Sequence, residues 1–95
     1  MHAVIRKYTA SSDVAAEARP QLNDLKRTMQ QTPGFVAYYF LETDDGIATI
    51  TITEDETGTQ ESMGRAAAWV QQHLPNSNLG APEVIRGQVV MDAKR

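Results

Sequence analysis

The fold is decided by residues 32–53, which read TPGFVAYYFLETDDGIATITIT. Aromatic and aliphatic side chains fill Phe35–Glu42, and β-branched residues alternate along Ile47–Thr53, a pattern typical of two adjacent strands. Between them, Thr43-Asp44-Asp45-Gly46 has the composition of a tight hairpin turn, of type I′ or a related form. This stretch therefore predicts a β-hairpin.

A strand and a helix are expected on each side of the hairpin. Alternating residues predict a first strand at 2–9, and Val84–Met91 predict the last strand. The helix before the hairpin is indicated by apolar residues at steps of three or four, namely Val14, Ala18, Leu22, Leu25 and Met29.

Pro20 interrupts this first helix, where it either introduces a kink or begins the regular part. The second helix is expected to run from Asp55 or Gln60 to His73, after a capping-box pattern. Its inward side would consist of Met63, Ala67, Val70 and Leu74.

The order strand, helix, strand, strand, helix, strand predicts an α+β, ferredoxin-like βαββαβ domain over residues 1–95. A four-stranded antiparallel sheet would carry both helices on one face. A chain of 95 residues buries only about 60 to 65% of the surface that its unfolded form exposes, so its own core is thin.

The strands divide into two sets of alternate residues. One set is apolar and is expected to face the helices: Ala3, Ile5, Val36, Tyr38, Phe40, Ala48, Ile50, Ile52, Ile85, Gly87 and Val89. The other set is mixed and too apolar for a fully solvated face, and includes Val4, Arg6, Tyr8, Phe35, Tyr39, Leu41, Ile47, Thr49, Thr51 and Arg86. Pairing of this second face with another copy predicts a homodimer through the sheets.

Composition excludes several functions. The net charge is −3 without a basic run, so nucleic acid is not expected as a partner. The chain lacks cysteine, and its two histidines, His2 and His73, have no metal-ligand spacing, so neither a metal nor a cofactor is predicted. No apolar stretch reaches the roughly 18 residues of a membrane span. A cytoplasmic domain without a membrane partner is expected.

Two segments resemble a known family. Residues 32–40, with the acidic-glycine turn that follows, and the helix end Ala67-Ala68-Trp69-Val70-Gln71-Gln72-His73-Leu74 are similar to small proteins of the dimeric α/β-barrel superfamily, in particular the antibiotic-biosynthesis-monooxygenase-like group. The resemblance implies a ferredoxin-like fold, sheets paired into a barrel and a small-molecule pocket between helices and sheet. Some members are cofactor-independent oxygenases of aromatic compounds, others degrade haem, and a haem would need His73 as its axial ligand.

Trp69 and His73 are one helical turn apart and share a face. The indole would form a pocket wall and the imidazole a base or hydrogen-bond donor beside a phenolic ligand. Alternatively, Trp69 covers the sheet edge and His73 interacts with the helix C-terminus as an imidazolium.

Arg86 lies among apolar residues of the last strand and would need a partner if buried. It would bind a ligand carboxylate or enolate, or else pair with Glu42, Glu83 or an acid of the other subunit. The same two interpretations apply to Arg6.

Tyr38 and Tyr39 are expected on opposite faces of the sheet, and the one that faces the helices would line the pocket with Trp69, unless both serve in packing. Two functions remain open. One is a cofactor-independent monooxygenase of a small phenol or quinol, with His73 and Arg86 as catalytic residues and Trp69, Tyr38 and Tyr39 as substrate-binding residues. The other is a non-catalytic dimeric binding or accessory domain.

Overall fold

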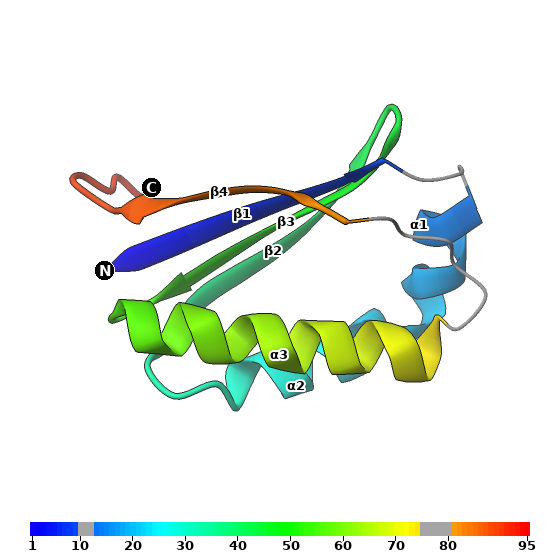
Figure 1. The fold of residues 1–95 in the computed structure, drawn as a ribbon, viewed down its shortest axis with the longest axis horizontal. Coiled ribbons are helices and arrows are strands. Elements are labelled where there is room, and N and C mark those ends of the chain that lie inside the picture. Colours follow the sequence, from blue (N-terminus) through cyan, green and yellow to red (C-terminus); the bar gives the residue numbers. More distant parts are fainter. Residues whose placement is uncertain (10–12, 75–80) are drawn as a thin grey trace.

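In a computed structural model of the protein, residues 1–9, 13–74 and 81–95 are described, except for the side chain of Asp13. Four strands form one antiparallel sheet in the order β2-β3-β1-β4: β1 (His2–Thr9), β2 (Phe35–Thr43), β3 (Gly46–Thr53) and β4 (Glu83–Gln88). The helices α2 (Leu22–Gln30) and α3 (Glu56–His73) lie on one side of this sheet, and no described helix covers the other side (Figure 1). The predicted ferredoxin-like fold is confirmed.

Pro20 divides the first helical region. The chain forms α1 (Asp13–Ala18), a short 3-10 helix η1 (Arg19–Gln21) that contains the proline, and then α2. Proline lacks the N–H that a continuous helix requires, which explains the interruption. The predicted apolar stripe is confirmed, because Val14, Ala18, Leu25 and Met29 are buried and Leu22 packs against them.

Helix α3 begins at a polar cap and passes close to the turn before β2. The Oδ1 atom of Asp55 accepts a hydrogen bond from the Gly58 N–H at 3.0 Å. A Cβ atom on Gly58 would lie 2.7 Å from the Pro33 carbonyl oxygen and 2.9 Å from the Thr53 side chain, so glycine permits this approach.

The inward side of α3 differs from the prediction. Ala67 is exposed and Met63 is only partly buried, whereas the buried positions are Gly58, Thr59, Ser62, Ala66 and Trp69. The helix is rotated relative to the predicted stripe because its small residues lie against the sheet, with Trp69 and the predicted Leu74 completing the core at its end.

The two strand faces are also exchanged in β1, β3 and β4, which corrects the sequence prediction. Val4, Arg6, Ile47, Thr49, Thr51 and Thr53 are buried against the helices. In β2 the assignment of Tyr38 and Phe40 is right, but a register shift between Phe35 and Ala37 turns Phe35 inward as well and leaves Val36 exposed. One extra residue in a strand reverses the alternation on one side of it.

The turn and the last strand differ in detail. Thr43 pairs with Gly46, and neither Asp44 nor Asp45 has a positive φ angle, so the turn is not of type I′. Strand β4 ends at Gln88 rather than at Met91, because its partner β1 begins at His2, opposite Gln88.

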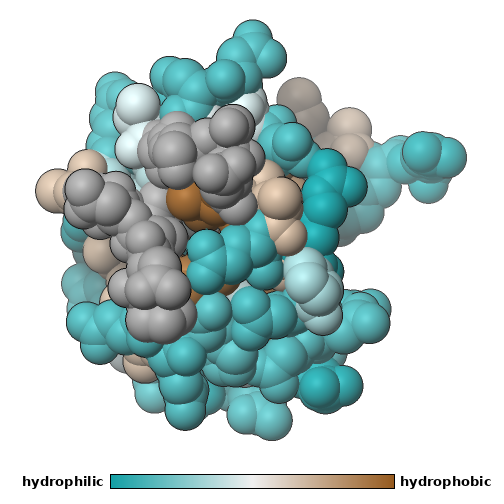
Figure 2. Space-filling model, turned by 90° about the vertical axis from the view of Figure 1, so that its right-hand side faces the viewer, coloured by the Kyte–Doolittle hydropathy of each residue, from teal (hydrophilic) through white to brown (hydrophobic). Residues whose placement is uncertain are grey.

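As a result, the apolar residues that alternate along β1, β3 and β4 lie mainly on the uncovered face of the sheet, together with Tyr39 and Leu41 of β2. Tyr39 and Ile85 are 55% and 59% exposed there, next to the partly buried Ile5, Ile50 and Ile52. By contrast, hydrophilic residues predominate among the coloured atoms in the view onto the end of the molecule that carries α1, with the most hydrophobic atoms near the centre and paler hydrophobic ones toward the sides (Figure 2). None of the described helices is long and apolar enough to cross a membrane.

Candidate functional site

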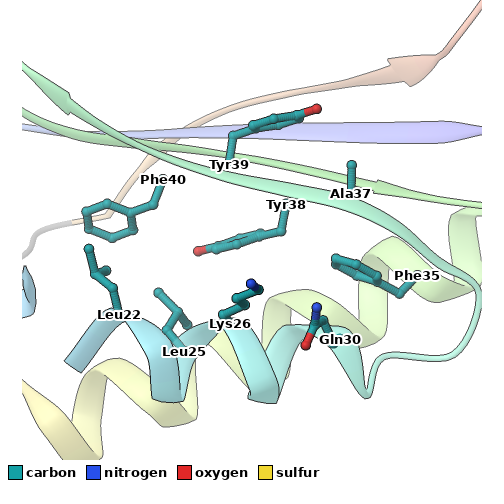
Figure 3. A pocket seen from close by; sticks show the side chains of 9 residues that line it. All are labelled: Leu22, Leu25, Lys26, Gln30, Phe35, Ala37, Tyr38, Tyr39 and Phe40. Atoms are coloured by element: carbon teal, nitrogen blue, oxygen red, sulfur yellow. The ribbon is translucent and has the colours of Figure 1, made fainter. Parts of the chain in front are cut away.

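A cleft of about 370 Å³ opens between α2 and the edge strand β2. Tyr38 and Phe40 extend from β2 toward α2, whereas the side chains of Ala37 and Tyr39 point away (Figure 3). Lys26 and Gln30 on α2 supply the polar part of the lining. An aromatic cleft of this volume, with few polar groups, has the size and character of a small-molecule site.

A second, much smaller cavity of about 20 Å³ lies deeper, between the sheet and α3. Leu25, Tyr38 and Phe40 line both cavities, so these three side chains form the wall between them. Arg6 and Thr49 line the inner cavity only. The inner cavity is large enough for about one water molecule, and a larger group would need one of the wall side chains to move.

Arg6 is the most unusual residue of the inner cavity. It is 3% exposed, and its Nε atom has no hydrogen-bond partner among the described residues. No carboxylate in the described part of the chain forms an ion pair with it. A buried cation without a partner is costly, because water no longer solvates the charge.

Tyr38 faces this cation in its neutral form. Burial raises the pKa of Tyr38 to about 12, although the nearby charge of Arg6 acts in the opposite direction. The phenol therefore keeps its proton at pH 7 and does not neutralise the guanidinium. The neighbouring hydroxyls of Thr49 and Thr51 are buried and also have no partner with hydrogen-bond geometry among the described residues.

A cluster of Asp24, Trp69 and His73 joins α2 to the end of α3. The Trp69 indole N–H donates to Oδ2 of Asp24 at 3.0 Å, and the same oxygen lies 3.2 Å from Nε2 of His73. The rings of Trp69 and His73 stack at a centroid distance of 4.6 Å. The hydrogen bond from Trp69 is the main reason why the pKa of Asp24 is lowered, and the charge of His73 contributes.

The surroundings of His73 decide what its ring does. Its second nitrogen, Nδ1, lies 3.0 Å from the Trp69 carbonyl oxygen, so both nitrogens face oxygen acceptors. A carbonyl and a carboxylate donate nothing, and both contacts are therefore hydrogen bonds only when each nitrogen carries a proton. In this arrangement both nitrogens of His73 are engaged within the cluster, and its ring packs against Trp69.

The structure brings together only part of the predicted set. Tyr38 and Trp69 line the inner cavity on opposite sides, and His73 stacks on Trp69. Tyr39 points to the uncovered face of the sheet, away from Tyr38, as expected for strand neighbours. Arg86 is exposed on the edge strand β4, near Glu56 and Thr59 at the start of α3, whereas His73 ends that helix.

The sequence did not indicate Asp24, and a pocket between helices and sheet was expected only because the resemblance implied it. Asp24 precedes Leu25 of the apolar stripe, and nothing in the sequence indicates which α2 side chain meets the end of α3. Arg6 was considered as a ligand-binding or ion-paired residue, but the sequence analysis placed it on the face away from the helices. It is buried because the faces of β1 are exchanged. Nowhere in residues 1–9, 13–74 and 81–95 do three histidine, cysteine or acidic side chains gather as metal ligands.

No family model and no curated protein matches the chain by sequence. Solved structures match it over nearly its full length. A protein of unknown function from Nitrosomonas europaea superposes with a TM-score of 0.77 at 15% identity, over 99% of this chain and 93% of its own. The chain also shares its fold with a putative antibiotic biosynthesis monooxygenase from Chloroflexus aurantiacus, at a TM-score of 0.69 and 15% identity, over 98% of this chain and 96% of its own.

Two further structures carry descriptions of activity. MhuD from Mycobacterium tuberculosis, a haem degrader with two haems bound in its active site, matches with a TM-score of 0.72 at 16% identity, over 99% of this chain and all of its own. SnoaB from Streptomyces nogalater, a cofactor-independent oxygenase, matches with a TM-score of 0.67 at 15% identity, over 99% of this chain and 97% of its own. At these identities the comparisons establish the fold, and the reaction has to be argued from the site.

Proposed function

We propose that this protein is a cofactor-independent, monooxygenase-like enzyme that acts on a small, enolisable aromatic molecule. The observation that carries the proposal is the aromatic cleft of about 370 Å³ between α2 and β2. A planar ring would lie against Tyr38, with Trp69 as the far wall of the deeper cavity and His73 holding the indole in place. Tyr39 borders the cleft but its side chain points away from α2, and Arg86 lies on β4 outside the cleft, so neither is assigned a part in the chemistry.

In this reaction the substrate supplies the electrons. An activated CH₂ group of the ring loses a proton, and the resulting carbanion reacts with O₂. The carbon becomes a carbonyl, and the second oxygen atom leaves as water together with the two hydrogens. The contribution of the protein is to bind the ring, exclude bulk water and stabilise the anion electrostatically.

The test is oxygen uptake with 1,8-dihydroxyanthrone, an enolisable aromatic ketone, measured above its rate of autoxidation. Lys26 is an exposed residue of the cleft lining, so Lys26→Trp blocks the entrance without disturbing the core. We expect this variant to lose at least 90% of the stimulated rate, whereas Asn23→Trp, on α2 outside the cleft lining, retains it. No stimulation by the wild-type protein over a series of enolisable phenols and quinols would contradict the proposal.

A non-catalytic binding domain is the second candidate. It is favoured by His73, because both of its nitrogens are engaged and the predicted general base is therefore not free. In that case the same compounds would bind in the cleft and be released unchanged. Binding by calorimetry without oxygen uptake separates this function from the enzymatic one.

We further propose that two copies associate through the uncovered face of the sheet. Isolated exposed apolar residues are common, but Tyr39, Leu41 and Ile85 share the uncovered face with the partly buried Ile5, Ile50 and Ile52, and a contiguous apolar surface usually marks an interface. The partner would cover Tyr39, Leu41 and Ile85 and add apolar burial to a small core.

A further inference from the structure

We infer that Arg6 is an anion anchor and that the ligand of the cleft carries a carboxylate or an ionised enolate directed at it. This inference rests on the cleft proposed above as the ligand site. It adds the charge of the ligand and the residue that selects it.

The first step is that Arg6 has no counter-ion among the side chains that the structure describes. Arg6 is 3% exposed, lines the inner cavity, and has no ion-pair partner among the described carboxylates. Tyr38 does not supply the charge, because its pKa is raised to about 12 by burial. The proposed partner subunit does not supply it either, because Arg6 faces the helices and the uncovered face is on the other side of the sheet.

The second step is the route to the guanidinium. Tyr38, Phe40 and Leu25 separate the inner cavity from the cleft, so only side chains and no backbone need to move. A ring in the cleft that displaces the Tyr38 phenol would bring an acidic substituent next to Arg6. The buried Thr49 hydroxyl, which also lines this cavity, would donate a second hydrogen bond to the anion.

The anionic group gains most from this position because it removes the cost of the unpaired cation as well as forming new contacts. A neutral ring of the same shape would leave the guanidinium unpaired. The site is therefore expected to discriminate by charge rather than by shape.

The experiment compares 1-hydroxy-2-naphthoate with its neutral amide, 1-hydroxy-2-naphthamide, by isothermal titration calorimetry. We expect the wild-type protein to bind the carboxylate at least tenfold more tightly than the amide. Arg6→Met, an unbranched apolar replacement, should reduce this preference to about twofold or less, and Arg6→Lys should retain part of it. Arg6→Met should also raise the melting temperature of the ligand-free protein, which a purely structural arginine would not do.

Lys26 is the matched control, because it is the cation of the outer cleft. Lys26→Gln should keep the carboxylate preference. The inference would be overturned if the wild-type protein bound both compounds with equal affinity. It would also be overturned if Lys26→Gln removed the preference for the carboxylate while Arg6→Lys left it intact. Neither result depends on whether Arg6→Met folds. Tight, charge-selective binding of the carboxylate together with no oxygen uptake from 1,8-dihydroxyanthrone would refute the enzymatic proposal and leave the anchor standing. Failure of both naphthalene compounds to bind would refute the anchor, and the oxygen-uptake assay with 1,8-dihydroxyanthrone would still test the enzymatic proposal separately.

Discussion

Two glycines of α3 have different surroundings, so the same substitution is expected to have opposite effects at the two positions. Alanine at Gly58 would place its Cβ 2.7 Å from the Pro33 carbonyl oxygen, and we expect a loss of about 1 to 3 kcal/mol in the free energy of unfolding. A Cβ atom on Gly64 would meet no other atom within 4 Å, and Gly64→Ala should stabilise the protein by about 0.5 to 1 kcal/mol. Urea denaturation of both variants measures the two signs, and a stabilising Gly58→Ala would contradict the close contact.

Asp24 gives the stability of the protein a specific dependence on pH. Its pKa lies below the ordinary value of 3.8, chiefly because the Trp69 indole donates to it, with further contributions from His73 and Arg27. A lowered pKa in the folded state stabilises the fold above about pH 4, and this contribution disappears as the pH falls through the folded pKa.

Asp24→Asn removes this titration. We expect the wild-type protein to be more stable than the variant at pH 6, and the difference between their melting temperatures to shrink toward pH 3. Arg27→Gln, which removes a weaker exposed contact of Asp24 at 3.5 Å, should change this profile less. A difference that stays constant from pH 6 to pH 3 would show that the carboxylate charge is not involved.

At the residue scale, sequence patterns identified chemically unusual side chains but not their surroundings. Trp69 and His73 were expected to share a face because they are four residues apart in a helix, and they do stack. Asp24 was not anticipated, since its contact with Trp69 spans 45 residues and depends on the packing of two helices. Arg86 and Arg6 looked alike in sequence, and the strand order separates them: both lie on the helix-covered face, but Arg6 is on the central strand β1 and is buried, whereas Arg86 is on the edge strand β4 and is exposed.

At the element scale, α3 depends on its N-terminal cap. Asp55 accepts the Gly58 N–H, and Asp55→Ala should cost about 1 kcal/mol of unfolding free energy. Asp55→Asn retains an equivalent oxygen and should keep most of the stability. Thermal unfolding followed by circular dichroism compares the two, and equal losses would indicate that charge rather than the hydrogen bond matters.

The elements themselves were largely predictable, because local patterns determine them. The hairpin, the first strand and the proline interruption follow from composition and spacing. The face of each strand did not follow, because alternate residues were apolar or β-branched on both faces. The irregularity at Val36 further reversed the pattern inside β2, and no residue in that segment marks it in advance.

At the scale of the whole molecule, the prediction concerns the oligomeric state. The wild-type protein should have about twice its 10.5 kDa chain mass in size-exclusion chromatography with light scattering. Ile50→Lys places a charge in the middle of the uncovered face and should shift the mass toward the monomer. Met91→Lys, exposed beyond the sheet, should leave the mass unchanged. A monomeric wild-type protein would refute association through this face.

The polar side chains beneath the helices have a consequence for thermal resistance. Thr51 is fully buried and its hydroxyl has no hydrogen-bond partner in the described part of the chain, so Thr51→Val should raise the free energy of unfolding by about 1 kcal/mol or more. Unlike Thr51, the buried residues Arg6 and Thr49 line the inner cavity, so a ligand that contacts them would also raise the melting temperature. At a hundredfold excess over its Kd, a ligand adds about 2.7 kcal/mol, which for a domain of this size is a melting shift on the order of 10 °C. Screening a compound library for a rise in the melting temperature would therefore identify ligands of the cleft without an assay for any reaction.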